Sequence, residues 1–131
     1  MHLNGCENMT VNHTPIYQQV ADWLENEILT GHYQAHARVP SQYQLAELFT
    51  INPATAGKGL TLLLEQNILY KKRGLGMFVV EDAQQRLQYK RQHVTLTELA
   101  QALITEARRV ELTDEALIQL IKTLQEEGAR D

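Results

Sequence analysis

The segment from Asn52 to Gly59, which reads NPATAGKG, combines glycines, a lysine and polar side chains in a way that could bind phosphate. A nucleotide-binding loop of the GxxxxGK(S/T) type wraps phosphates with backbone N–H groups and holds magnesium through its final hydroxyl. This segment has Asn52 in place of the first glycine and Gly59 in place of the hydroxyl residue. It also follows a helical pattern, whereas that loop follows a buried strand. We therefore do not expect nucleotide hydrolysis, and no nucleophile and base are spaced in a way that indicates another enzyme.

The same residues suit the first turns of a helix that reads DNA. Asn52 is a favoured N-cap, and Pro53 suits the first helical position. Asn can pair with adenine, an Ala or Thr methyl can meet the thymine methyl, and Lys can reach guanine or phosphate. A recognition helix presents its first turns to the major groove. The residues that it would bring there are Asn52, Ala54, Thr55 and Lys58.

Two glycines inside this predicted helix need an explanation, because each costs roughly 1 kcal/mol relative to Ala. Gly59 shares a helix face with Ala56 and Leu63, which predicts close packing against another helix. Gly57 lies off that face and is expected to let the helix approach the DNA backbone. The alternative for both glycines is a suboptimal helix that the fold tolerates.

Two further helices are predicted before the recognition helix. Thr14-Pro15, as N-cap and first turn, followed by apolar residues at helical spacing, predicts a helix that ends near residue 30. Ser41 and Gln44 have the spacing of a capping box and begin a second, short helix. Residues 50–51 alone separate that helix from the next cap. Two capped helices joined by so short a turn predict a helix-turn-helix.

A basic-edged hairpin is predicted after the recognition helix. Asn67 can take the left-handed conformation that ends a helix. Residues 68–72 and 77–80 are short apolar-rich strands on either side of Gly74-Leu75-Gly76. Such a hairpin next to a helix-turn-helix forms a wing.

The rest of the chain is predicted to be a helical tail, because no glycine or proline occurs between Glu81 and Gly128. It has two apolar stripes, with Thr113 as the cap of the last helix. The residues predicted to mediate dimerisation through these stripes are Leu96, Leu99, Leu103, Ala107, Leu117, Leu120, Ile121 and Leu124. The predicted fold is mainly α with a small β-hairpin wing. It comprises a flexible arm over residues 1–13, a winged helix-turn-helix over 14–82 and a two-helix dimerisation tail over 83–131.

The charge is unevenly distributed along the chain. The formal net charge is −4, which is unusual for a DNA-binding protein. Between Arg38 and Gly76, however, five bases accompany two acids, which gives a local charge of +3 (5 − 2). One basic surface on an acidic body is therefore expected.

Several classes of site are not expected. The single Cys6 excludes an internal disulfide and offers no metal framework. His32 and His36 lie too far apart in an extended segment to share a metal ion. We expect no metal and no other cofactor. No stretch resembles a signal peptide or a membrane span, so a cytoplasmic protein without a membrane partner is expected.

Three segments together resemble the winged helix-turn-helix domain of GntR-type bacterial transcription regulators: PIYQQVADWLENEILTG, VPSQYQLAELFTINPATAGKGLTLLLEQNILY and KKRGLGMFVV. The resemblance covers residues 15–80. It implies double-stranded DNA as the partner, with a recognition helix in the major groove and a wing at the minor groove. Together with neighbouring basic side chains and Tyr43, the predicted DNA-contacting residues are Arg38, Ser41, Tyr43, Asn52, Ala54, Thr55, Lys58, Lys72, Arg73, Gly74 and Gly76.

The chain departs from the usual family pattern at three places. Family members usually carry Arg at the position of Tyr43, Pro-Gly at that of Ala35-His36, and Gly at that of Asn67. Tyr43 cannot replace a charged guanidinium, although it can donate to a phosphate or stack on a base. The alternative is a solvent-exposed tyrosine without a role in DNA binding.

The tail resembles the short dimerisation appendage of the YtrA-like subfamily. This resemblance implies a homodimer that reads a pseudo-palindrome, most simply as a repressor. The rival hypothesis is a protein-interaction module that keeps the winged fold without binding DNA. The sequence does not specify a small-molecule effector.

Overall fold

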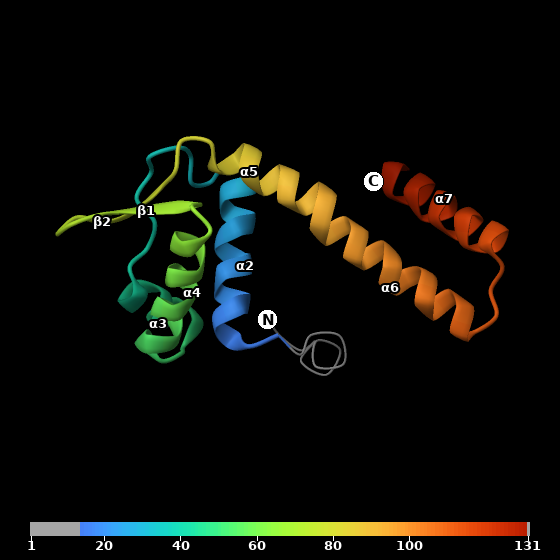
Figure 1. The fold of residues 1–131 in the computed structure, drawn as a ribbon, viewed down its shortest axis with the longest axis horizontal. Coiled ribbons are helices and arrows are strands. Elements are labelled where there is room, and N and C mark those ends of the chain that lie inside the picture. Colours follow the sequence, from blue (N-terminus) through green and yellow to red (C-terminus); the bar gives the residue numbers. More distant parts are fainter. Residues whose placement is uncertain (1–13, 131) are drawn as a thin grey trace. The chain divides into compact units, whose positions relative to one another are not determined.

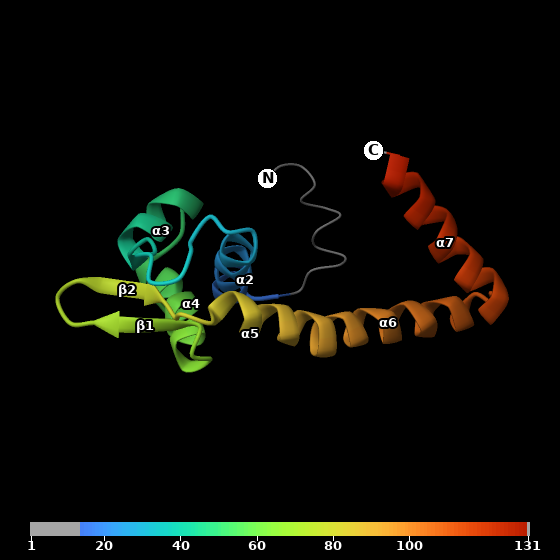
Figure 2. The ribbon, with the colours of Figure 1, turned by 90° about the horizontal axis from the view of Figure 1, so that it is seen from above.

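The structure is a computed structural model that describes residues 14–130; the predicted arm over residues 1–13 lies outside the described residues. The chain forms two compact units, one up to Gln88 and one from Tyr89 onward. The predicted mainly α fold with a hairpin wing is confirmed, and Figures 1 and 2 show the hairpin projecting beside the helices of the first unit. The elements are α2 (Ile16–Leu29), α3 (Gln42–Phe49), α4 (Pro53–Glu65), β1 (Leu69–Lys72), β2 (Gly76–Val79), α5 (Ala83–Lys90), the π-helical turn η1 (Arg91–Thr95), α6 (Leu96–Arg109) and α7 (Asp114–Arg130).

The start of α2 differs from the sequence-based prediction. Its N-cap is Pro15, which makes no side-chain cap hydrogen bond, and not Thr14. Pro15 has no polar side chain, and its carbonyl oxygen accepts from the backbone N–H groups of Gln18 and Gln19. The Gln19 side chain in turn donates to the carbonyl oxygen of Thr14 at 2.9 Å. Hydrogen bonds donated by Gln18 and Gln19, which lie within the helix, thus stabilise its start.

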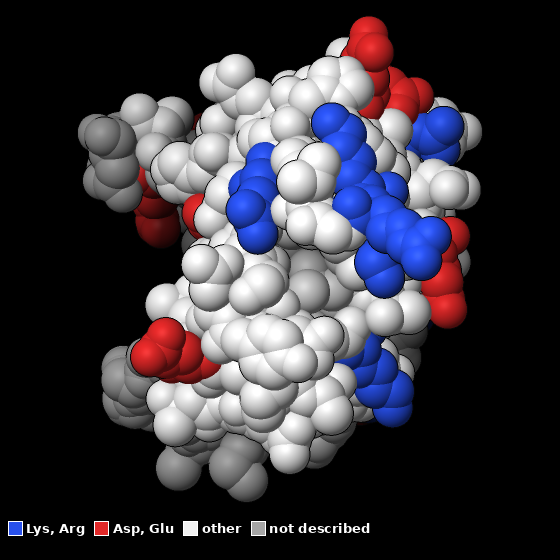
Figure 3. Space-filling model, turned by 90° about the vertical axis from the view of Figure 1, so that its left-hand side faces the viewer, with Lys and Arg blue, Asp and Glu red and all other residues white. Residues whose placement is uncertain are grey.

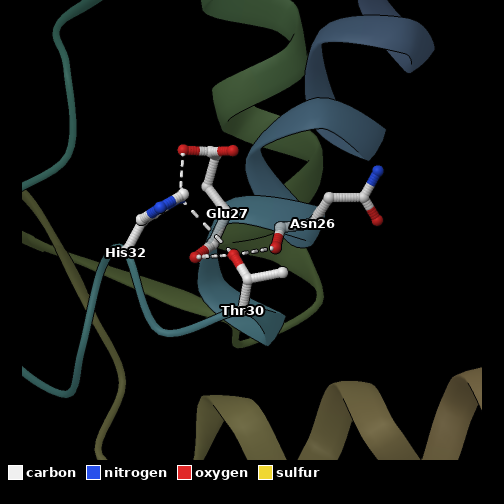
Figure 4. Close-up of polar contacts among 4 residues, drawn as sticks. All are labelled: Asn26, Glu27, Thr30 and His32. Atoms are coloured by element: carbon white, nitrogen blue, oxygen red, sulfur yellow. Dashed lines mark hydrogen bonds and ion pairs between the residues drawn. The ribbon is translucent and has the colours of Figure 1, made fainter. Parts of the chain in front are cut away.

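The end of α2 is closed by polar side chains, as Figure 4 shows. Thr30 Oγ1 donates to the carbonyl oxygen of Asn26 at 2.9 Å. His32 Nδ1 lies 2.9 Å from a carboxylate oxygen of Glu27. Gly31, with φ of 89°, turns the chain away from the helix. Since the last carbonyl groups of a helix lack partners within it, these contacts stabilise its end.

The predicted helix-turn-helix is formed by α3 and α4. Ser41 Oγ accepts from the Gln44 N–H at 3.1 Å, and the Gln44 side-chain oxygen accepts from the Ser41 N–H at 2.8 Å. Thr50 then turns the chain with a left-handed φ of 55°. Asn52 caps α4, and Pro53 occupies its first turn. Both capping predictions are confirmed.

The core of the first unit lies among α2, α3, α4, the hairpin and the start of α5. Its buried residues are Val20, Ala21, Leu24, Ile28, Val39, Leu45, Ala46, Ala56, Leu60, Leu63, Ile68, Leu69, Val79, Ala83 and Leu87. Because Ala83 and Leu87 have no exposed surface, the start of α5 belongs to this unit. The unit therefore ends after Gln88, not after residue 82 as the sequence suggested.

The two glycines of α4 lie against different neighbours. A Cβ atom on Gly59 would come within 2.8 Å of the Tyr17 carbonyl oxygen in α2. Gly59 therefore permits the close helix packing that the sequence predicted. A Cβ on Gly57 would come within 3.1 Å of the Gln42 side-chain oxygen in α3. Its predicted approach to a DNA backbone stays a prediction.

The wing is an antiparallel hairpin in which Leu69 pairs with Val79 and Lys72 with Gly76. Residues 36–39 run along the other edge of β2, where the Val39 N–H donates to the Met77 carbonyl oxygen at 3.0 Å. The sequence predicted an extended connector over residues 32–40, but only its last part next to β2 is extended, since residues 35–36 form a turn and His36 has positive φ. This last part ties the wing to the start of α3.

Two departures from the family pattern keep the backbone shape that glycine would give. His36 and Asn67 both adopt positive φ, at 66° and 60°. Asn tolerates this conformation better than most residues. His36 Nδ1 lies 2.8 Å from the Tyr70 hydroxyl, so a side-chain contact with β1 accompanies its unusual backbone.

The second unit contains η1, α6 and α7. The rings of Tyr89 and His93 stack at 4.0 Å where it begins. Thr113 Oγ1 accepts from the Ala116 N–H at 3.1 Å, as expected for the cap of the last helix. Glu111, with φ of 59°, turns the chain between α6 and α7.

Candidate nucleic-acid interface

The first turn of α4 presents small side chains to solvent. Asn52 and Ala54 are exposed, and Thr55 is partly exposed. Asn52 Oδ1 accepts from the Ala54 N–H at 2.7 Å, which fixes the amide across the helix start. A bidentate contact with adenine needs both the acceptor and the donor of the amide. While Asn52 caps the helix, one lone pair of Oδ1 is engaged, and its NH₂ group remains available to DNA.

Lys58 follows one turn later and is exposed. Its Nζ atom lies 4.6 Å from the centroid of the Tyr17 ring, in the range of a cation–π contact. Tyr17 comes from α2 and is partly buried. The sequence did not single out Tyr17, because the two residues are 41 positions apart (58 − 17) and no local pattern links them.

The start of α3 and the base of the wing share one groove of about 190 Å³. Four of the predicted DNA-contacting residues line it, namely Arg38, Ser41, Tyr43 and Gly76. Lys71 also lines the groove, and Tyr43 is 69% exposed. The Ser41 hydroxyl accepts within the capping box, which leaves its hydrogen free to donate. The groove thus joins two cations and two hydroxyl groups.

The turn of the wing contains the remaining predicted residues. Gly74 and Gly76 have φ of 77° and 119°, so both occupy conformations that favour glycine. Arg73 and Lys72 are exposed, and Lys72 Nζ lies 4.8 Å from the Phe78 ring centroid. Leu75 lies between the two glycines and is 58% exposed. An exposed leucine on a tight turn is a candidate contact that sequence analysis missed, since it was counted only as a turn residue.

The basic side chains gather on one face of the first unit. Figure 3 shows Lys and Arg side chains in the upper part of the face that carries the hairpin, with Asp and Glu side chains toward its edges. Arg38, Lys58, Lys71, Lys72 and Arg73 are all exposed. A surface with this excess of positive charge attracts polyanions even when the net charge of the chain is negative. The local excess of positive charge counted in the sequence therefore corresponds to a surface feature.

The tail exposes apolar side chains to solvent. Six of the eight residues predicted for dimerisation are at least 37% exposed, and these are Leu96, Leu99, Leu103, Leu120, Ile121 and Leu124. Ala107 and Leu117 are buried within the chain, at 7% and 6% exposure. These two therefore pack inside the chain and offer little surface to a partner.

Within residues 14–130, His, Cys, Asp and Glu form no group of three or more that could hold a metal ion. His32 pairs with Glu27, and His36 Nε2 lies 3.6 Å from Glu81. No helix in the same residues has the length and hydropathy needed to cross a membrane.

Comparison with known sequences places these features in context. The family model described as bacterial regulatory proteins, gntR family, matches residues 16–79. The HTH-type transcriptional repressor YtrA of Bacillus subtilis is 29% identical over 85% of this chain and 85% of its own length. Three other regulators match about half of this chain but only 14% to 30% of their own lengths. This chain therefore spans less than a third of those longer relatives.

Solved structures give a similar result. A GntR family transcriptional regulator from Listeria monocytogenes superimposes with a TM-score of 0.71 and 28% identity, over 86% of this chain and 96% of that one. AraR(DBD) in complex with operator ORX1 superimposes with a TM-score of 0.50 and 28% identity, over 51% of this chain and 81% of that one. The first match extends beyond the winged domain, and the second is confined to about half of the chain.

Proposed function

The chain belongs to the gntR family of bacterial regulatory proteins and carries that family's DNA-binding domain, and from this premise we propose that it binds specific duplex sequences as a homodimer and represses transcription. Members of this family are transcription regulators, not enzymes. The observation that carries the proposal is that the first turns of α4 and the glycine turn of the wing are exposed, in a unit with a face on which Lys and Arg side chains gather.

Sequence reading is assigned to the start of α4. Ala54 and Thr55 offer methyl groups suited to the thymine methyl, and the Asn52 NH₂ group can donate to a base or a phosphate. Lys58 supplies the only positive charge of α4. Because the other exposed side chains of the first turn are small, the helix can approach the floor of the major groove closely.

The wing is assigned to the minor groove. Arg73 can enter a narrow groove of strong negative potential, and the positive φ angles at Gly74 and Gly76 bring the backbone close to the DNA. Leu75 would then contact the sugars or the groove floor, where apolar side chains of minor-groove proteins insert. Arg38 and Ser41 line the groove between α3 and the wing, in reach of a phosphate.

Dimerisation is assigned to the exposed apolar residues of the tail. Two copies can bury these stripes against each other, and a two-fold dimer matches a pseudo-palindromic site. AraR(DBD) in complex with an operator supports operator DNA as the partner. Repression is supported by YtrA, a transcriptional repressor that matches this chain over most of its length.

The rival function is that of a protein-interaction module. Substitutions that each remove one positive charge distinguish it from DNA binding. We expect Lys58→Ala and Arg73→Ala each to weaken duplex binding and to reduce the salt slope by about 1 per half-site. Lys122→Ala in the tail removes the same charge and serves as the control. Fluorescence anisotropy over a salt series measures both quantities. Equal affinity for all four proteins would favour the interaction module.

A further inference from the structure

We propose that Tyr17 of α2 is a positioning residue that holds Lys58 of the recognition helix in place for DNA. This inference rests on the proposed DNA-binding function. It starts from the contact between the two side chains, in which the ammonium lies 4.6 Å from the ring centroid. Tyr17 carries no charge of its own and acts through Lys58.

The position of the ring is set by the packing of α2 on α4. Gly59 is the neighbour of Lys58, and a Cβ there would lie 2.8 Å from the Tyr17 carbonyl oxygen and 3.2 Å from Val20 Cβ. Val20 lies one turn after Tyr17 and is 2% exposed, so this part of α2 is anchored in the core. The absence of a side chain at Gly59 therefore brings the Tyr17 backbone under α4, next to Lys58.

The ring constrains Lys58 without consuming its hydrogen bonds. A lysine ammonium has three donors, and a ring face occupies only one side of it. A free lysine side chain loses rotamer freedom when it is ordered at an interface, which weakens binding. A lysine already held over a ring has lost part of that freedom before DNA arrives. Since Lys58 is the only cation in α4, its orientation determines the charge that the helix presents.

The test uses the full-length chain and a fluorescent duplex that the wild-type chain selects from a random-sequence pool. The variants are Tyr17→Leu, Tyr17→Phe, Lys58→Ala and the double variant Tyr17→Leu with Lys58→Ala. We expect Tyr17→Leu to weaken binding by about 2- to 5-fold per half-site, since part of the free-energy cost of ordering a lysine side chain at an interface would then be paid on binding. Tyr17→Phe keeps the ring face and should keep the wild-type affinity. In the Lys58→Ala background, Tyr17→Leu should have no further effect.

A second readout examines the contact in the free protein. A proton held over an aromatic face is shifted upfield in an NMR spectrum. We expect the Lys58 CεH₂ protons to show this shift in the wild type and in Tyr17→Phe, and to lose it in Tyr17→Leu. Circular dichroism of each variant confirms that the fold is retained. If Tyr17→Leu does not fold, the Tyr17→Phe affinity and the wild-type NMR shift still decide the matter.

Four results would overturn the inference. Tighter binding by Tyr17→Leu would mean that the ring holds Lys58 back from DNA. An equal loss in the wild-type and Lys58→Ala backgrounds would mean that Tyr17 acts independently of Lys58. An unshifted Lys58 signal in the wild type would mean that the contact is absent in solution. If the wild-type chain selects no duplex, the proposed function itself fails, whereas a loss on Arg73→Ala with none on Tyr17→Leu refutes only the inference.

Discussion

The two units of this chain use their apolar residues in opposite ways. In the first unit, Leu24, Leu45 and Leu63 are at most 1% exposed, because three helices and a hairpin surround them. In the tail, Leu99 of α6 and Leu124 of α7 are 60% and 57% exposed. A contiguous exposed apolar stripe is typical of an interaction site. The comparison shows that the first unit buries its apolar residues within itself, and it supports the proposal that a second copy covers the stripe of the tail.

The largest effect is expected from matched leucine truncations in the two units. Leu63→Ala removes a side chain with no exposed surface, and we expect it to lower the free energy of unfolding by about 2–5 kcal/mol. Leu99→Ala removes an exposed side chain and should change the unfolding of the first unit by less than about 0.5 kcal/mol. Urea denaturation followed by Trp23 fluorescence measures this unit. An equal loss of unfolding free energy in both variants would contradict the contrast between the buried core of the first unit and the exposed stripe of the tail.

A charge introduced into the exposed apolar stripe of the tail tests whether this stripe mediates dimerisation. Leu99→Glu should raise the dimer dissociation constant by about 100-fold, or about 2.8 kcal/mol, because dimerisation would bury an unpaired carboxylate. Gln101→Glu adds the same charge on the other side of α6 and serves as the control. Analytical ultracentrifugation over a concentration series reports the assembly state. A Leu99→Glu dimer as tight as the wild type would place the interface elsewhere.

The two glycines of α4 test how tightly the closed unit is packed. We expect Gly59→Ala to destabilise the chain by about 1–3 kcal/mol, since its Cβ would press on the α2 backbone. Gly57→Ala meets only the end of the Gln42 side chain and gains up to about 1 kcal/mol of helix propensity. Thermal unfolding of both variants gives the comparison. If Gly59→Ala were stabilising, the close contact between α2 and α4 would not exist in solution.

The smallest expected effects come from one helix cap in each unit. Ser41→Ala should cost the first unit about 1 kcal/mol, because the Gln44 N–H loses its acceptor. Thr113→Ala removes the matching bond at α7 and should reduce helicity in the tail while leaving the unfolding midpoint of the first unit unchanged. Hydrogen exchange resolved by residue separates the two regions. A lower midpoint for the first unit in Thr113→Ala would show that the units unfold together.

Local chemistry made the winged domain predictable. The starts of α3 and α4 could be predicted from Ser41, Asn52 and Pro53, because a cap acts within three residues of its own position. Apolar spacing identified the core faces, and glycines identified the wing. The same reasoning placed an N-cap at Thr14, where the structure has Pro15, since two adjacent residues can each begin a helix.

What sequence reasoning missed depends on contacts between distant residues. The domain boundary was placed too early because α5 looks polar, yet Ala83 and Leu87 reach the core of the first unit. Ala107 and Leu117 match the stripe pattern but pack within the chain. The contact of Tyr17 with Lys58 joins two helices whose packing no local pattern encodes. Tertiary contacts of this kind appear only once the elements are assembled.

The central claim is sequence-specific DNA binding, and selection of bound duplexes from a random pool at two salt concentrations tests it most directly. The account predicts that one two-fold symmetric motif emerges and that affinity for it falls steeply as salt rises. Absence of any motif, with weak binding that vanishes at physiological salt, would contradict the account and turn attention to protein partners of the tail.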